Sequence, residues 1–154
     1  MKGAAMRVLT TADVATLEAF AEILLPGSRE AGIANYIDHQ LAAPADRQLL
    51  MIKYLNVNPP FAAFYRAGLA ALDAIAKTAH QVRFHELDRG LQHELVSSAA
   101  SENPPGWGDG APAPFYVFVV RSDALDVTYG TIEGFEALGI PYMAHIMPPS
   151  RWGE

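Results

Sequence analysis

Apolar residues recur at helical spacing through most of this 154-residue chain, and proline or glycine interrupts each run. The first run follows Thr10 and Thr11, either of which can cap a helix, and Asp13 favours the positive end of that helix. Pro26-Gly27 ends the run. Its apolar stripe consists of Val14, Leu17, Ala21, Leu24 and Leu25. Side chains spaced by three and four residues share one face, so the pattern predicts an amphipathic helix.

Four further helices are predicted by the same pattern, at residues 33–41, 45–55, 60–76 and 88–99. Pro60 suits the first turn of the third of these, and Asp88 is expected to cap the last. In the range 45–55, the side chains expected to point inward are Leu49, Ile52 and Leu55. In the range 60–76, they are Phe61, Phe64, Tyr65, Leu69, Leu72, Ile75 and Ala76.

The longest irregular stretch, residues 103–114, holds four prolines and three glycines and so cannot lie inside a helix or a central strand. Residues 115–129 suit a strand or a helix. We expect a helix, because one strand without a partner leaves its backbone groups unpaired. Its expected inward stripe is Phe115, Phe118, Val119, Ser122, Leu125 and Tyr129. The sequence thus predicts an all-α bundle of five to six helices.

The last part of the chain is apolar and repeatedly broken by glycine and proline. Between residues 129 and 152 the only charged side chains are Glu133, Glu136 and Arg151. Such a segment is too apolar for a solvated linker and too interrupted for one regular element, so it needs a surface to cover it. We therefore expect a helical domain at residues 1–128 and an extended docking tail at 129–154. The predicted partner-contacting residues are Trp107, Tyr129, Phe135, Ile140, Pro141, Tyr142, Met143, His145, Met147 and Trp152.

Both tryptophans lie in proline- and glycine-rich surroundings, where a large ring needs cover. Anchors at subunit interfaces are enriched in tryptophan and tyrosine, so Trp107 and Trp152 suit that role. They suit equally well the role of a plug within the chain's own core. The sequence leaves both interpretations open.

Composition and charge limit the classes of ligand. Charged residues are 18% of the chain, against roughly 25% in typical soluble domains, which suggests that a partner covers part of the surface. Residues 1–80 hold seven basic and seven acidic side chains, while 81–154 hold four and ten, so the second half accounts for the net charge of -6. This balance argues against nucleic acid, which needs a clustered basic surface. The absence of cysteine excludes disulfides and thiolate metal sites.

No stretch of the sequence has the apolar length of a membrane span, and the first ten residues lack the apolar core of a signal peptide. From the sequence we expect a soluble protein without a membrane span. It would be cytoplasmic as written, or periplasmic if the chain is a mature form or is exported with its partner.

The glycines and serines that most invite a catalytic interpretation do not support one. Gly106, Gly108 and Gly110 lack the spacing and the preceding strand of a phosphate-binding loop. Ser97 and Ser98 lie in a predicted helix with no nucleophile motif around them. We predict no catalytic and no cofactor-binding residue in this chain.

The histidines give no predicted metal site. His80, His85 and His93 are not spaced by three or four residues, as ligands on one helix face would be. His39 is expected at the surface. His145 is expected to have a structural or interface role, because no orienting carboxylate or nucleophile can be placed beside it.

Short motifs near both ends of the chain form a recognisable pair. The first comprises Leu9-Thr10, Leu17, Glu22-Ile23-Leu24-Leu25-Pro26-Gly27, Ala31-Gly32-Ile33 and Tyr36-Ile37-Asp38. The second comprises Tyr129-Gly130, Gly134-Phe135 and Leu138-Gly139-Ile140-Pro141. Together they resemble the gluconate 2-dehydrogenase subunit 3 family. Phe135 stands where that family usually has tryptophan, and Thr131-Ile132 stands where it often has Gly-Asn. The twin-arginine signal common among the family's small subunits is not found in this sequence.

The resemblance implies a small all-helical accessory subunit of a flavin-dependent dehydrogenase of the glucose-methanol-choline type. In such complexes the large subunit holds FAD and oxidises an alcohol or sugar hydroxyl, often passing electrons to a cytochrome c subunit. The small subunit supports the folding, export or stability of its partner. Two alternatives remain open from the residues themselves. One is a self-associating helical module, and the other is a small enzyme that uses His145 or the region of His85.

Overall fold

A computed structural model describes residues 5–143 of the chain. All of the regular structure in these residues is helical. Five α-helices have ten residues or more, two are shorter, and the described residues contain no strand. The predicted all-α bundle is confirmed. The elements are α1 (Thr11–Leu24), α2 (Ser28–Ala31), α3 (Ile33–Ala42), the 3-10 turns η1 (Ala45–Arg47) and η2 (Met51–Tyr54), α4 (Ala62–His80), the 3-10 turn η3 (Phe84–Glu86), α5 (Arg89–Ser101), α6 (Ala113–Tyr129) and α7 (Ile132–Ala137).

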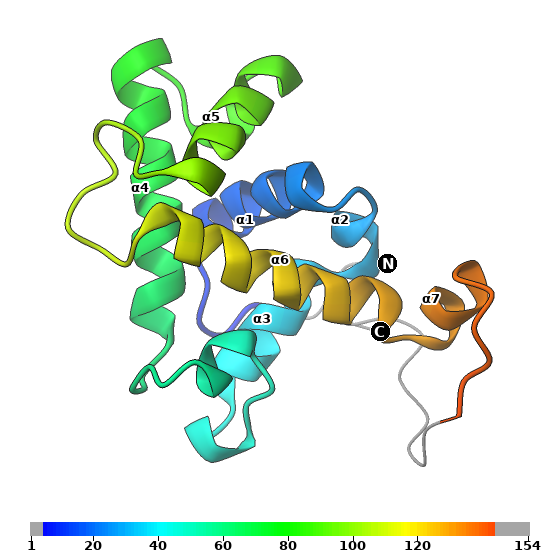
Figure 1. Cartoon of the computed structure of the whole chain (residues 1–154). Helices are drawn as coiled ribbons and strands as arrows, with labels where there is room; N and C mark the ends of the chain where they lie inside the picture. Colours follow the sequence, from blue (N-terminus) through cyan, green and yellow to red (C-terminus); the bar gives the residue numbers. More distant parts are fainter. Residues whose placement is uncertain (1–4, 144–154) are drawn as a thin grey trace.

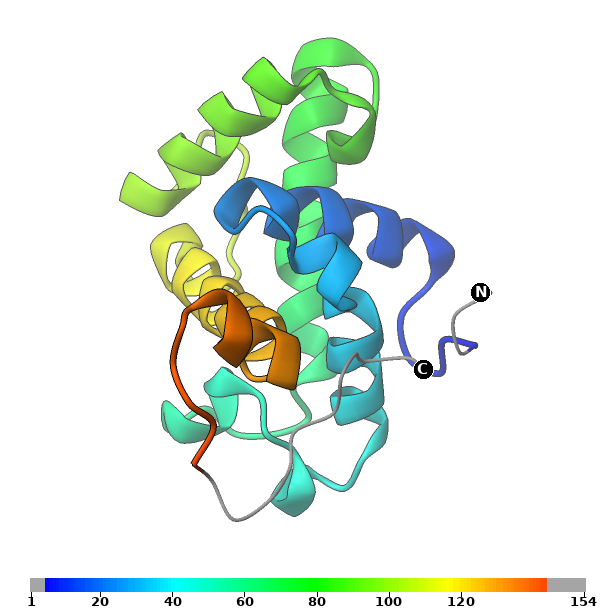
Figure 2. The same ribbon diagram turned by 90° about the vertical axis from the view of Figure 1, so that its right-hand side faces the viewer.

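Helix α6 is the element around which the others are arranged (Figure 1). It contacts each of the other six α-helices and the η2 turn. The long helix α4 crosses near one end of α6, and α7 lies at the opposite end (Figure 1). Figure 2 views the molecule from that opposite end, so that α7 lies in front of α6. The C-terminal end of α6 and the short helix after it are thus placed at one extremity of the bundle.

Helices α1 and α5 begin at caps that the sequence predicts, whereas α4 begins at Ala62, so Pro60 precedes its first turn instead of lying in it. The Thr10 side chain accepts a hydrogen bond from the Asp13 N–H at 3.1 Å, and the Asp13 carboxylate accepts one from the Thr10 N–H at 2.9 Å. This reciprocal capping box satisfies two backbone donors that a helix start otherwise leaves unpaired. Asp88 caps α5 by accepting from the Leu91 N–H at 3.0 Å. Pro114 lies in the first turn of α6, where its missing N–H costs nothing.

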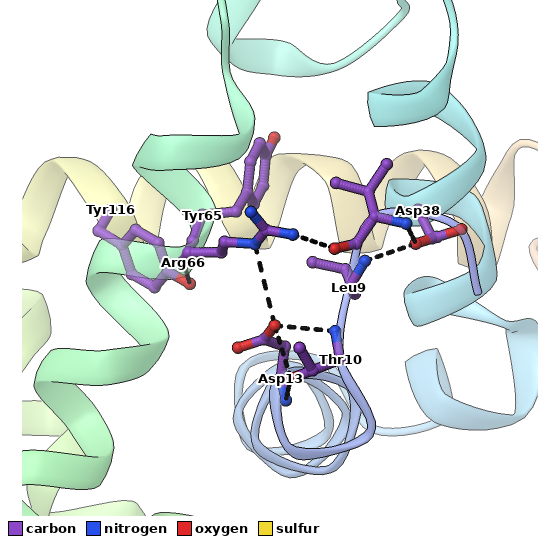
Figure 3. A network of polar contacts seen from close by, with 8 residues as sticks. Leu9, Thr10, Asp13, Asp38, Tyr65, Arg66 and Tyr116 are labelled. Carbon is purple, nitrogen blue, oxygen red and sulfur yellow. Dashed lines mark hydrogen bonds and ion pairs between the residues drawn. The ribbon is translucent and has the colours of Figure 1, made fainter.

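The segment before α1 is tied down by a carboxylate from α3 (Figure 3). Asp38 accepts hydrogen bonds from the backbone N–H groups of Arg7, Val8 and Leu9, each at 2.8 Å. Burial alone would raise the pKa of the Asp38 carboxyl, but the three N–H donors and the Arg7 charge leave that pKa below its ordinary value. From α4, Arg66 donates to the Val8 carbonyl. These contacts fix the entry of the chain into the bundle.

A cluster of aromatic rings forms the centre of the core. The Phe20 ring lies 6.1 Å from the Phe84 ring and 5.6 Å from the Tyr116 ring. Tyr116 can lie directly on α4 because residue 68 is glycine, where a β-carbon would come within 2.2 Å of the Tyr116 ring. The predicted inward face of residues 60–76 is confirmed: Phe61, Tyr65, Leu69, Leu72 and Ala76 are buried, and Phe64 and Ile75 are half-buried.

The predicted helix at 45–55 is wrong, because the structure has two separate 3-10 turns there. Side chains from other helices take up the backbone groups that an α-helix would have used. The Gln40 side chain accepts from the Leu49 N–H, and the Asp123 carboxylate accepts from the Met51 N–H, both at 2.8 Å. As a result Ile52 is buried and Leu55 half-buried, but Leu49 is 54% exposed.

The helix predicted at 115–129 is confirmed, but two residues of its expected inward stripe face outward. Phe118 is 51% exposed and Leu125 is 39% exposed. Val119 alone of that stripe is fully buried, among a different set of inward residues: Ala113, Tyr116, Val117, Val120, Asp123, Ala124 and Val127. The sequence carries two apolar stripes on this helix, and periodicity cannot tell which of them faces the core.

Candidate partner-binding surface

Two glycines make the tight corner between α6 and α7. A β-carbon on Gly130 would come within 2.3 Å of the Asp126 carbonyl oxygen, and one on Gly134 within 2.5 Å of the Tyr129 α-carbon. Thr131 caps α7, since its hydroxyl oxygen accepts from the Gly134 N–H at 3.1 Å. The absence of side chains at these two positions therefore lets α7 fold back closely on the end of α6.

A hollow of about 210 Å³ lies at this corner and brings together the two motif-bearing ends of the chain. Gly27 and Ala31 line it from the first motif, and Tyr129 and Gly134 from the second. The remaining lining residues are Glu30, Thr128, Thr131, Glu133 and Ala137. Segments that lie about one hundred residues apart in the sequence are thus packed against each other, as the contact between α2 and α6 also shows.

Beyond α7, the chain turns back at a glycine. Gly139 has a positive φ of 66°, the Gly139 N–H donates to the Glu136 carbonyl at 3.0 Å, and the Ile140 N–H donates to the Phe135 carbonyl at 3.0 Å. This pair of bonds is a Schellman motif, which ends a helix and satisfies its last carbonyls. The Tyr142 ring then lies 5.1 Å from the Phe135 ring, edge to face.

The segment that results presents apolar side chains to solvent. Leu138 and Ile140 are each 51% exposed, and Met143 is 85% exposed. Phe135 and Tyr142 are half-buried against each other. We call these five residues the α7 surface. Contiguous exposed apolar side chains of this kind mark sites where a protein contacts a partner.

The predicted partner-contacting residues separate into groups. Ile140, Pro141 and Met143 are exposed, while Tyr129, Phe135 and Tyr142 are half-buried, and all six lie at or after the end of α6. The last three predicted residues lie outside the described part of the chain: His145, Met147 and Trp152. Helical structure continues to Ala137, beyond the predicted start of the tail at residue 129.

Trp107 lies away from this group and inside the core. It is only 5% exposed, its ring nitrogen Nε1 donates to the Ala111 carbonyl at 2.9 Å, and its ring lies 5.9 Å from that of Tyr116. The ring has almost no surface to offer to a partner. Its inclusion among interface anchors is therefore corrected: Trp107 is an intramolecular plug between the 103–112 loop and α6.

Exposed apolar residues also lie outside the predicted set of partner contacts. Leu138 stands at the end of α7 and belongs to the α7 surface, but it was not among the predicted contacts. Phe118 and Leu125 on α6 were assigned to the core. The signal that could have identified them is the second apolar stripe of the same helix, which includes Tyr116, Val120 and Val127.

The buried carboxyl of Asp123 has a strongly raised pKa. Burial raises the pKa of Asp123 to about 7, although hydrogen bonds from the Met51 N–H and the Tyr65 hydroxyl act in the opposite direction. Asp123 is fully buried, and these two donors connect it to η2 and to α4. A carboxyl enclosed in this way has no access to a substrate, so we interpret it as a structural group.

A second polar cluster joins α1, α4 and η3. The Thr16 hydroxyl donates to the Asp73 carboxylate at 2.9 Å and lies 3.4 Å from the His85 ring nitrogen Nδ1. Asp73 also accepts from the Phe84 N–H at 3.1 Å and lies 3.8 Å from the Arg83 guanidinium. Because Thr16 is fully buried, its hydroxyl is not available as a nucleophile. The cluster attaches η3 to the two helices.

Two further features concern the described residues as a whole. Between residues 5 and 143, histidine, aspartate and glutamate side chains nowhere gather in a group of three that could hold a metal ion. In the same range, no helix has the length and apolar character needed to cross a membrane.

Comparisons with known proteins extend the resemblance seen in the two motifs. The model of the family described as Gluconate 2-dehydrogenase subunit 3 matches residues 11–142. Comparisons with curated proteins and with solved structures return no match. The family match runs from the first residue of α1 to Tyr142, so it includes the bundle, the hollow and most of the α7 surface. The chain belongs to the gluconate 2-dehydrogenase subunit 3 family.

Proposed function

We propose that this chain is a non-catalytic small subunit that binds and stabilises the large subunit of an FAD-dependent alcohol or sugar dehydrogenase of the glucose-methanol-choline type. The observation that carries the proposal is the family match over residues 11–142. The family is named for one subunit of a gluconate dehydrogenase, which implies that other subunits exist. In this account the large subunit holds FAD and performs the oxidation, in some complexes with a cytochrome c subunit as electron acceptor.

The α7 surface supports this function because it has the chemistry of an interface core. Aromatic and methionine side chains are enriched at interfaces, and this surface combines Phe135, Tyr142 and Met143 with two aliphatic residues. It is held in place by the Gly134 corner and the Schellman turn, so little order would have to be created on binding.

Stabilisation of the partner follows from mass action. A chain that binds only the folded large subunit stabilises that folded form, by about 2.7 kcal/mol when the free chain is at one hundred times its dissociation constant. The benefit grows with affinity and needs no chemistry in the small subunit. The polar clusters at Asp123 and Thr16 fit this role, because their hydrogen bonds join helices of the bundle.

The test is to produce the large subunit, an FAD-dependent dehydrogenase of this class encoded in the same genome, with and without this chain. We expect the two chains to co-elute as one complex. We also expect the large subunit to gain soluble yield and melting temperature when the small chain is present. A large subunit that is equally soluble and stable alone, with the small chain eluting separately, would contradict the proposal.

A further inference from the structure

Helix α6 has a second apolar face that is only partly covered by the rest of the described chain. Phe118, Ser122, Leu125 and Tyr129 follow one another at spacings of four, three and four residues, so they share one side of the helix. Phe118 is 51% exposed, Leu125 is 39% exposed and Tyr129 is half-buried. We call these four residues the outer face of α6. In Figure 1 the helix runs across the near side of the bundle with no other helix drawn over it.

The outer face is unusual because it is apolar although the opposite side of α6 already packs in the core. Tyr116, Val120, Ala124 and Val127 are buried there. A helix that is apolar on both sides is normally buried on both sides. The Ser122 hydroxyl needs no hydrogen bond from a partner, since it donates to the Phe118 carbonyl at 2.9 Å within the helix. A partner that covers the outer face therefore leaves the Ser122 hydroxyl hydrogen-bonded.

The outer face is continuous with the α7 surface. Tyr129 is the last residue of α6, and it also lines the hollow at the α6–α7 corner together with Glu133 and Gly134. The chain passes from there directly into α7, which packs on the end of α6. A partner seated on the α7 surface would thus meet the outer face of α6 as the next apolar area.

Charge indicates what kind of partner fits. The charged side chains exposed on α6 and α7 are Arg121, Asp126, Glu133 and Glu136, three acidic and one basic. The whole chain has a net charge of -6 at pH 7. Two copies of this chain would bring like charges together, which is costly at an interface. A different protein with basic side chains around an apolar patch would be complementary.

We propose that the outer face of α6, centred on Phe118 and Leu125, is the principal contact for the dehydrogenase large subunit. The matching area on that subunit is an apolar patch rimmed by lysine or arginine side chains. This inference rests on the proposed function and adds the place and the chemistry of the contact. The α7 surface forms the adjoining part of the same interface.

The experiment measures the affinity of the purified large subunit for three versions of the full chain. Phe118→Ala removes a central ring, and a loss of roughly thirtyfold in affinity is expected, as for an interface anchor. Leu125→Asp places a charge in the apolar centre and is expected to weaken binding at least as much. His93→Asp is the matched control, because it introduces the same side chain at an exposed position of another helix, α5. Circular dichroism checks that all three retain the parental helix content.

The outcomes separate this inference from the proposed function. If the parent chain binds and the two α6 variants bind as well as His93→Asp, the α6 contact is wrong and the proposed function stands. If the parent chain does not bind the large subunit, the proposed function fails and this inference fails with it. A free chain that forms dimers, which Phe118→Ala converts to monomers, would assign the outer face to a second copy instead. Binding that weakens as salt is added supports the basic rim, and salt-independent binding contradicts it.

Discussion

The phenolic hydroxyl of Tyr65 donates a 2.6 Å hydrogen bond to the carboxyl group of Asp123 inside the core. The second carboxyl oxygen accepts from the Met51 N–H at 2.8 Å. One buried side chain therefore joins α4, α6 and the η2 turn. Burial raises its pKa to about 7, which makes the stability of the bundle sensitive to pH.

Replacement of Asp123 by asparagine should flatten that pH dependence. The ordinary pKa of this carboxyl is 3.8 and the folded value is about 7. Between these values the folded chain holds a proton that the unfolded chain has released, so this group's contribution to stability is full below that window and is lost as pH rises through it. The loss is on the order of a few kcal/mol. Melting temperatures of the parent and Asp123→Asn should diverge across this range, and parallel curves would contradict the assignment.

The contribution of Asp38 to stability should change at lower pH than that of Asp123, and in the opposite direction. Its folded pKa lies below the ordinary 3.8, so its contribution is present above that value and is lost as the pH falls below it. Asp38→Ala leaves three N–H donors without their acceptor and should cost about 1–3 kcal/mol. Hydrogen exchange should show lost protection at Arg7, Val8 and Leu9. Asp46→Ala is the control, because Asp46 is exposed. Equal exchange in both variants would show that Asp38 does not anchor the segment before α1.

Gly134→Ala should disturb the α6–α7 corner. Its β-carbon would lie 2.5 Å from the Tyr129 α-carbon, so backbone must move to admit it. Overpacking of this kind typically costs about 1–3 kcal/mol. Gly110→Ala is a matched control, because the nearest atom to its β-carbon is 4.0 Å away. A lower melting temperature only for Gly134→Ala is expected, and equal melting temperatures would show that the corner tolerates a methyl group.

Leu72→Ala should be strongly destabilising, because Leu72 of α4 is fully buried in the hydrophobic core. Truncation of a buried leucine typically costs about 2–5 kcal/mol. The same change at Leu49, which is 54% exposed, should cost far less. Denaturant unfolding of the two variants measures the difference. A Leu72→Ala protein as stable as Leu49→Ala would mean that the register of α4 is wrong.

Features that depend on neighbouring residues in the sequence could be predicted. The Thr10 and Asp13 capping box and the Asp88 cap need only three or four residues, and the sequence contains them. The exposure of Ile140 and Met143 also follows from a local pattern, an apolar segment with glycine and proline and no helix to bury it.

Features decided by distant residues could not be predicted. The 45–55 segment has helical periodicity, but Gln40 and Asp123 capture its backbone N–H groups, and Asp123 lies in a helix more than sixty residues further along the chain. The orientation of α6 is set by the glycine at position 68, which admits the Tyr116 ring against α4. The same packing covers Trp107, whose ring lies 5.9 Å from that of Tyr116 and which lines a hollow together with Phe64 and Ala71 of α4.

We expect the dehydrogenase large subunit to bind this chain on the α7 surface and on the adjoining outer face of α6. The most direct test is the affinity of the full chain for that purified large subunit, compared with that of Ile140→Asp and of the control His93→Asp. We predict saturable binding by the parent and the control, and at least tenfold weaker binding by Ile140→Asp at unchanged helix content, since an interface contact worth about 1.4 kcal/mol or more would be lost. No binding by the parent chain, or equal binding by all three proteins, would contradict the account.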